Sequence, residues 1–137
     1  MDYSISLTIP SSTTSSSPSS TTVKVSAYVL NVYEIEFPAG CAGLVGVSVW
    51  QGGHQLYPST EGQWFISDNF TIKRDTYYKI VRGGNTLTIK GYNSDDTYSH
   101  TIQFRCSIEK DWVVSLHNDL NRMNRLLKAF LGKFGIA

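Results

Sequence analysis

The feature that most constrains the fold is a change in the spacing of apolar residues near residue 110. Before that point apolar and polar residues alternate in short runs such as "YSISLTI", and turn formers such as "GGN" and "NSDD" separate the runs. Alternation of this kind is typical of strands that bury one face, and turns about every eight to twelve residues are typical of sandwiches and barrels. The sequence therefore predicts a mainly β fold, an antiparallel β-sandwich over residues 1–109. Jelly-roll and immunoglobulin-like topologies both fit this pattern.

Three local expectations refine this strand pattern. The run of residues 23–37 changes its alternation at residues 30–32, which predicts a β-bulge or a kinked strand. Gly52 and Gly53 lie between two runs and predict a tight hairpin. Residues 10–22, "PSSTTSSSPSSTT", contain no apolar side chain, so we expect a flexible surface loop there.

From residue 110 to residue 137 the apolar spacing becomes helical. The intervals alternate between three and four residues, which is an a/d heptad seam formed by Val113, Leu116, Leu120, Met123, Leu127, Phe130 and Phe134. Asp111 stands where an N-cap is expected, and Gly132 stands where a helix would end. The sequence predicts an amphipathic helix over about residues 111–132, which acts as a docking or oligomerisation helix.

A helix of this length is marginal alone in water, because ordering it costs entropy that burial of its seam must offset. The seam could dock on its own sheet, on other copies, on a foreign partner or on a lipid surface. Its narrow and regular stripe favours self-association, since a helix lying on a sheet usually has a broader apolar face. We expect a homo-oligomer, with a parallel bundle of three or more helices as the favoured form.

Composition narrows the range of partners. The net charge of +1 and the pI of about 7.8 give no overall field for nucleic acid, so no nucleic-acid partner is expected. No stretch reaches the length of a membrane span, and "MDYSISLTIP" lacks the apolar run of a secretory signal, so we expect a soluble intracellular product. Cys41 and Cys106 lie in apolar runs and are expected to be buried thiols, although a bridge between them stays open.

Two segments carry candidate sites. The segment of residues 50–65 brings aromatic and amide side chains together, and it could stack on a sugar ring through a candidate ligand surface of Trp50, His54, Tyr57 and Trp64. The alternative is ordinary strand packing, which we favour because aromatics are common in sheets.

The second segment, "YNSDDTYSH", could bind calcium or supply an acid and base through Asn93, Asp95, Asp96 and His100. We favour a plain turn there, because most of these residues are turn formers. The three histidines share no metal-ligand spacing and no nucleophile motif is present, so we expect no enzyme activity, cofactor or metal.

Two blocks of the sequence, "FPAGCAGLVGVSVWQGGHQLYPSTEGQWF" and "GYNSDDTYSHTIQFR", carry a family resemblance. They resemble small β-sandwich proteins from the genomes of tailed phages and archaeal viruses. The resemblance implies a jelly-roll-like virion structural protein, such as a capsid, decoration, vertex or tail subunit. Such a protein would be made in the host cytoplasm, would reside in the virion, and would contact itself and other virion proteins. A carbohydrate-binding module and a partner-recruiting adaptor are the alternative functions.

Overall fold

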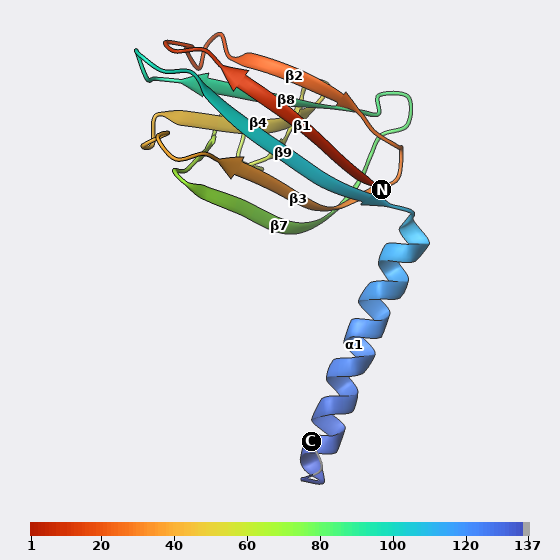
Figure 1. Ribbon diagram of the computed structural model, residues 1–137. Coiled ribbons are helices and arrows are strands. Elements are labelled where there is room, and N and C mark those ends of the chain that lie inside the picture. The colour runs from red at the N-terminus through yellow and green to blue at the C-terminus, as the bar shows by residue number, and fades with distance from the viewer. Residues whose placement is uncertain (136–137) are drawn as a thin grey trace.

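The computed structural model describes residues 1–135, and these form two antiparallel sheets and one helix. One sheet has four strands in the order β1 (Asp2–Ile9), β9 (His100–Glu109), β3 (Val29–Phe37) and β7 (Phe70–Lys79). The other has five, with β2 (Ser19–Lys24), β8 (Thr86–Asn93), β4 (Val45–Gln51) and β5 (His54–Tyr57) in order, and β6 (Phe65–Ile66) also paired with β4. The predicted mainly β sandwich is confirmed (Figure 1).

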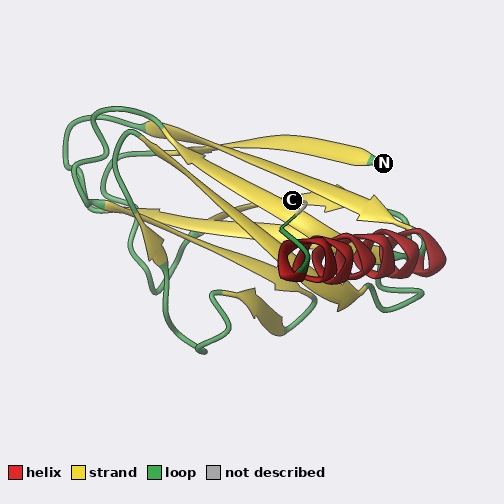
Figure 2. Ribbon diagram, turned by 90° about the horizontal axis from the view of Figure 1, so that it is seen from below, coloured by secondary structure: helices red, strands yellow, loops and turns green. Residues whose placement is uncertain are grey.

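The order of the strands is that of a jelly roll. The chain crosses between the two sheets from β1 to β2, from β2 to β3 and from β3 to β4, and it does so again from β6 to β7, from β7 to β8 and from β8 to β9. All pairings within the sheets are antiparallel. Each sheet is therefore built from strands that are distant in the sequence, as in two Greek keys that span both sheets. Figure 2 shows the two layers of strands, with the helix outside both of them.

The core lies between the sheets, and period two explains how it is filled. Along β9 every second side chain is buried, from His100 through Ile102, Phe104 and Cys106 to Ile108, while the intervening residues point outward. The largest fully buried side chains come from both sheets and include Phe37, Phe104, Ile35, Leu87 and Ile89. Interdigitation of two apolar faces is the usual source of stability in such sandwiches.

The expectations for residues 23–37 are borne out only in part. The pairing of β3 shifts register between Leu30 and Val32, which confirms the predicted bulge. The run is not one strand, however, because β2 ends at Lys24 and β3 begins at Val29 in the other sheet. The β4–β5 hairpin is confirmed, with Gly52 at a φ of 57°, the left-handed region that glycine adopts without strain.

The Ser/Thr-rich segment is shorter as a loop than predicted. Residues 19–22 belong to β2 and pair with β8, so the expected loop over residues 10–22 is wrong at its C-terminal end. An edge strand needs backbone pairing on only one side and can keep its outward side chains polar. A backbone hydrogen bond holds the remaining loop against the sandwich: the carbonyl of Thr13 accepts the N–H of Asn93 at 2.9 Å.

Helix α1 (Asp111–Lys133) follows β9 directly and extends away from the sandwich (Figure 1). The predicted start near residue 111 is confirmed, but Asp111 is not the N-cap: it is the first helical residue, and Lys110 occupies the N-cap position without a side-chain hydrogen bond. The helix continues one residue beyond the expected end at Gly132.

Candidate functional site: the projecting helix

The helix is attached to the sandwich only at its first turns. Val114 is 7 % exposed and is the one buried side chain of α1 among residues 111–133. Asp111 accepts a hydrogen bond from the hydroxyl of Tyr77, and its Oδ2 lies 3.4 Å from Nζ of Lys79. These two contacts, with the hydroxyl the larger influence, lower the pKa of the Asp111 carboxyl. One buried valine and an exposed polar cluster hold the first turns of the helix, which we call the helix root. The later turns, up to Lys133, bury no side chain on the sandwich.

The side of the helix that faces the sandwich is polar. A crevice of about 210 Å³ lies between the helix root and the bulged region of the sheet. On the helix side it is lined by His117, Asn118 and Asn121, and on the sheet side by Asn31 and Asp75 among others. Val114 is the one apolar helix residue that lines this crevice, and no seam residue within residues 111–135 does so. The helix therefore does not use its seam to pack on its own sheet.

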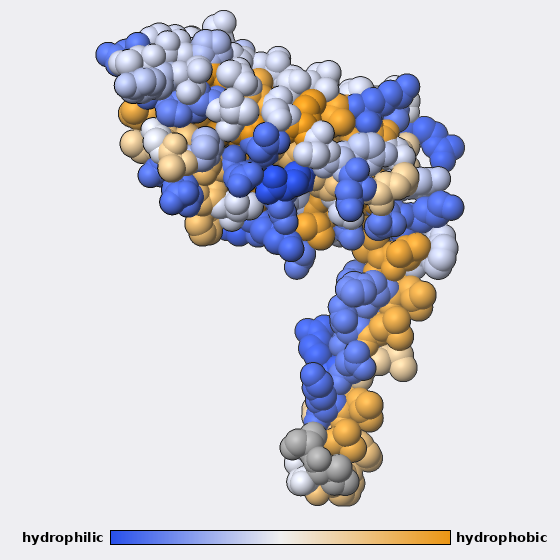
Figure 3. Space-filling view, viewed as in Figure 1, coloured by the Kyte–Doolittle hydropathy of each residue, from blue (hydrophilic) through white to orange (hydrophobic). Residues whose placement is uncertain are grey.

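The apolar side of the helix faces away from the sandwich and is exposed. Figure 3 shows it as a continuous stripe along the helix, on the side opposite the polar residues. Eight large apolar side chains on it are each 51–66 % exposed: Trp112, Leu116, Leu120, Met123, Leu126, Leu127, Phe130 and Phe134. We call these eight residues the apolar face.

The size of the apolar face is unusual for a lone chain. If a large apolar side chain is taken as roughly 200 Å² in full, the face presents on the order of 900 Å². The largest apolar patch on a typical monomer is only about 300–600 Å². A standard protein interface buries about 800 Å² on each partner. The apolar face is therefore large enough to be one side of a stable interface.

The predicted seam and the apolar face overlap but are not identical. Six of the seven predicted residues belong to the face, whereas Val113 is half-buried beside the root. Trp112 and Leu126 were missed by the a/d pattern. Each directly precedes an a-type residue, the g position of the heptad, so an apolar g position was the signal that could have found them. With Trp112 and Leu126 the apolar face is wider than an a/d seam alone.

Charges on the helix are divided along its length. Asp111 and Asp119 lie in the N-terminal half, and all the cationic side chains, Arg122, Arg125, Lys128 and Lys133, lie in the C-terminal half. Near the far end the rings of Phe130 and Phe134 pack edge to face, with centroids 5.0 Å apart. The helix thus has an acidic half with smaller seam residues and a basic half with aromatic ones.

The candidate ligand surface of residues 50–64 is divided between two faces of a sheet. Tyr57 points between the sheets, where its ring stacks on Tyr33 with centroids 4.3 Å apart. Trp50 lies on the outer face, since its neighbour Val49 is buried in the core, and Trp64 packs edge to face on Tyr92 at 5.0 Å. The structure therefore does not bring the predicted aromatic residues together on one platform.

The contacts of Trp50 further limit it as a sugar-stacking group. Nζ of Lys90 lies 4.1 Å from the centroid of its ring, and its Nε1–H donates to Oγ of Ser48 at 2.8 Å. His54 is exposed at the neighbouring hairpin. One face of the indole is thus covered, and its only donor is used within the sheet, which is what ordinary surface packing requires.

The "NSDD" segment is a hydrogen-bonded turn. Oδ1 of Asp95 accepts the backbone N–H groups of Thr97 and Tyr98, and its Oδ2 lies 3.0 Å from Nε2 of His100. The carboxyl oxygens are occupied by these partners, and no cluster of three or more metal-binding side chains occurs within residues 1–135. These contacts, led by the Thr97 N–H, lower the pKa of Asp95.

The lowered pKa of Asp95 predicts an acid-sensitive turn. Its stabilising contribution is complete at pH values above 3.8, the ordinary aspartate pKa, and is lost as the pH falls through the lower pKa of the folded state. We expect Asp95→Asn to flatten the loss of stability below that pH in urea titrations. Asp96→Asn, a matched change at the next residue, should keep the wild-type profile, and equal profiles for the two variants would contradict this assignment.

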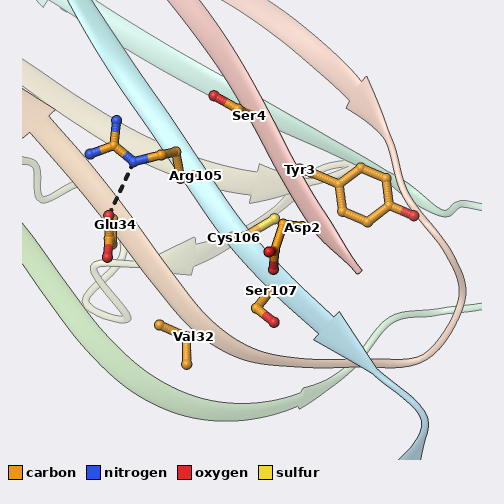
Figure 4. Close-up of a pocket in the computed structure, with 8 residues that line it drawn as sticks. All are labelled: Asp2, Tyr3, Ser4, Val32, Glu34, Arg105, Cys106 and Ser107. Atoms are coloured by element: carbon orange, nitrogen blue, oxygen red, sulfur yellow. Dashed lines mark hydrogen bonds and ion pairs between the residues drawn. The ribbon is translucent and has the colours of Figure 1, made fainter.

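A second hollow lies on the outside of the four-stranded sheet and measures about 280 Å³ (Figure 4). Its only cation among the lining residues is Arg105, whose guanidinium is paired with Glu34 at 3.1 Å and with Glu36 at 3.2 Å. Cys106 is also among the lining residues, but burial raises the pKa of its thiol to about 12, so it is protonated at neutral pH. Among its lining residues the hollow therefore offers no unpaired cation and no thiolate at neutral pH.

Cys41 and Cys106 are both buried free thiols in the described structure, which confirms the expectation of buried thiols. Over residues 1–135, no helix has the length and apolar content needed to cross a membrane. Scans against protein-family models and the curated proteins found no match to this chain. What the chain can do is therefore inferred from its geometry, in which the apolar face is the dominant surface.

Proposed function

We propose that the chain is a non-enzymatic subunit of a larger assembly and that copies are held together by the apolar face of α1. The observation that carries this proposal is the orientation of the helix. Its polar side lines the crevice against its own sheet, and its apolar face points outward (Figure 3). An outward apolar face on a helix that is anchored only at its first turns is suited to contacting other helices and not to closing the core.

Energetics support the same proposal. A helix of 23 residues is marginal alone in water and needs tertiary or quaternary burial to persist. Burying on the order of 900 Å² contributes roughly 20 kcal/mol per copy at about 25 cal/mol per Å². Association itself costs about 4–15 kcal/mol. Burial of the face therefore contributes more free energy than association costs. The width of the face favours three or more helices around one core.

The setting that we propose is a virion, in which the chain is a capsid, decoration, vertex or tail subunit that also contacts other virion proteins. The resemblance of residues 37–65 and 91–105 to phage and archaeal-virus sandwich proteins supports this setting. Jelly rolls are common in capsid proteins, although the fold alone does not determine function. Neighbouring capsid, portal or tail genes are expected beside the coding sequence, and a metabolic operon would contradict the placement.

The two alternative functions have less support. A carbohydrate-binding module needs exposed aromatic rings on one surface, whereas Trp50 is covered by Lys90 and Tyr57 lies between the sheets. A partner-recruiting adaptor would use the same apolar face for a foreign chain. It would stay monomeric until that chain is added, which separates it from self-assembly.

Dilution tests the proposal, because the helix is expected to lose its order when copies separate. Circular dichroism at 222 nm should fall on dilution from high to nanomolar concentration, while the β signal near 215 nm persists. A helical signal that is unchanged over the whole range would contradict self-assembly. Anionic vesicles added to the dilute protein provide the second arm: recovery of the helical signal would mean that a lipid surface, and not another copy, covers the face.

A further inference from the structure

Charge and side-chain size are distributed unevenly along α1. If the proposed function holds, this distribution favours one orientation of the paired helices. We propose that the helices pair antiparallel, so that the two sandwiches of a pair lie at opposite ends. The register sets Leu120 against the partner's Phe130 and Leu116 against the partner's Phe134. Met123 then faces the partner's Leu127, so that within residues 116–134 each a-type residue meets a d-type residue.

Side-chain volume supports this register. In a parallel pair Phe130 and Phe134 would meet their own copies at one end, while the smaller leucines would meet at the other. The edge-to-face ring pair, with centroids 5.0 Å apart, makes the far end of the a/d seam bulkier than its near end. The antiparallel register places this ring pair against Leu116 and Leu120 of the partner subunit. The outer layers then each combine a phenylalanine with a leucine and the central layer combines Met123 with Leu127, which keeps the helices evenly spaced.

Charge supports the same orientation. Asp119 and Lys133 both occupy g positions, which flank the seam, and they lie seven residues on either side of Leu126. Antiparallel pairing brings Asp119 close to the partner's Lys133, and the two-fold symmetry repeats the contact. It also sets the acidic half of each helix beside the basic half of the other and opposes their dipoles. An exposed ion pair adds little affinity, but it selects between orientations.

The position of the sandwich permits this arrangement. Each body lies on the polar side of its helix, at the end that carries Asp111, and the apolar face is free along its length (Figure 1 and Figure 3). A second helix can therefore approach the face without meeting the body of the first copy. A wide face that includes Trp112 and Leu126 is covered more completely when two such pairs associate, which gives an even number of copies.

Spin labels at three positions that share one place in the heptad, on the side of the helix opposite the seam, test the orientation. Asn118→Cys, Arg125→Cys and Gly132→Cys all lie at f positions, seven residues apart, while the native Cys41 and Cys106 stay buried and unlabelled. Antiparallel pairing centred near residue 125 offsets the outer two label pairs along the axis by about 21 Å, at 1.5 Å per residue. The shortest dipolar distance should then be at residue 125 and should increase by several ångströms at residues 118 and 132.

Three equal distances would establish a parallel bundle and overturn the antiparallel register, while the proposed assembly would stand. The absence of any dipolar coupling in a sample of single-chain mass would instead overturn the proposed function itself. Light scattering on the same labelled samples separates these two outcomes.

Discussion

Replacing Leu120 and Leu127 by Asp is expected to convert the assembly into folded monomers of 15.3 kDa. Both side chains lie at the centre of the apolar face, 51 % and 55 % exposed in the single chain. In the assembly each aspartate would be a buried and unpaired charge, which costs about 3–5 kcal/mol. Two such charges in every copy would remove most of the free energy of association. The mass should fall in sedimentation, and the helical signal should fall with it.

The control for this change carries the same charges elsewhere on the helix. Asn118→Asp with Ala129→Asp adds two aspartates on the side of α1 opposite the seam, so it should leave the mass unchanged. The near-ultraviolet spectrum of the sandwich should be the same in both double variants, because neither touches the core. A seam variant that keeps the wild-type mass, or a control that dissociates equally, would contradict the role of the apolar face.

Asn93→Ala is expected to cost roughly 2–4 kcal/mol of unfolding free energy, the largest loss that we expect from a polar residue of the sandwich. Its side chain is 0 % exposed and donates from Nδ2 to the carbonyls of Ile9, at 3.2 Å, and Tyr98, at 2.9 Å. Its Oδ1 accepts the N–H of Asp95 at 3.0 Å. Truncation leaves these three buried or half-buried backbone groups without their partner, and each such group is costly.

Asn31→Ala provides the matched comparison in urea denaturation. Oδ1 of Asn31 is buried without a hydrogen-bond partner among residues 1–135, so removing this amide should change stability by no more than about 0.5 kcal/mol. Equal losses at the two positions would mean that the cost comes from side-chain packing and not from the hydrogen bonds of Asn93. A negligible loss at Asn93 would show that water replaces the amide at this end of the sandwich.

Much of the fold could be predicted from the sequence because half-buried strands leave a direct pattern. The alternation along residues 100–108 corresponds to the buried and exposed faces of β9, and the register change at residues 30–32 is the bulge of β3. The pattern did not predict residues 19–22 as part of β2, since an edge strand made of Ser and Thr differs little from a loop in composition. The end of β2 and the whole of β3 were also predicted as one strand run, because alternation does not show where the chain crosses between sheets.

The candidate site was predicted in part, for similar physical reasons. The heptad spacing identified the helix and most of its apolar face, but spacing alone does not show on which side of the helix the sandwich lies. Val114, which falls outside the seam, is the residue that sets this orientation. The residues of the candidate ligand surface do not share one face of the sheet. A register shift between Val49 and Trp50 directs Tyr57 into the core and leaves Trp50 outside.

Covering of the apolar face by other copies of the chain would set the mass of the protein in solution. Light scattering on the unaltered protein measures this mass over a wide range of concentration. We predict a mass that is a whole multiple of 15.3 kDa at high concentration and that decreases toward 15.3 kDa on dilution. A mass of 15.3 kDa at every concentration, with the helix still fully ordered, would show that no other copy covers the face.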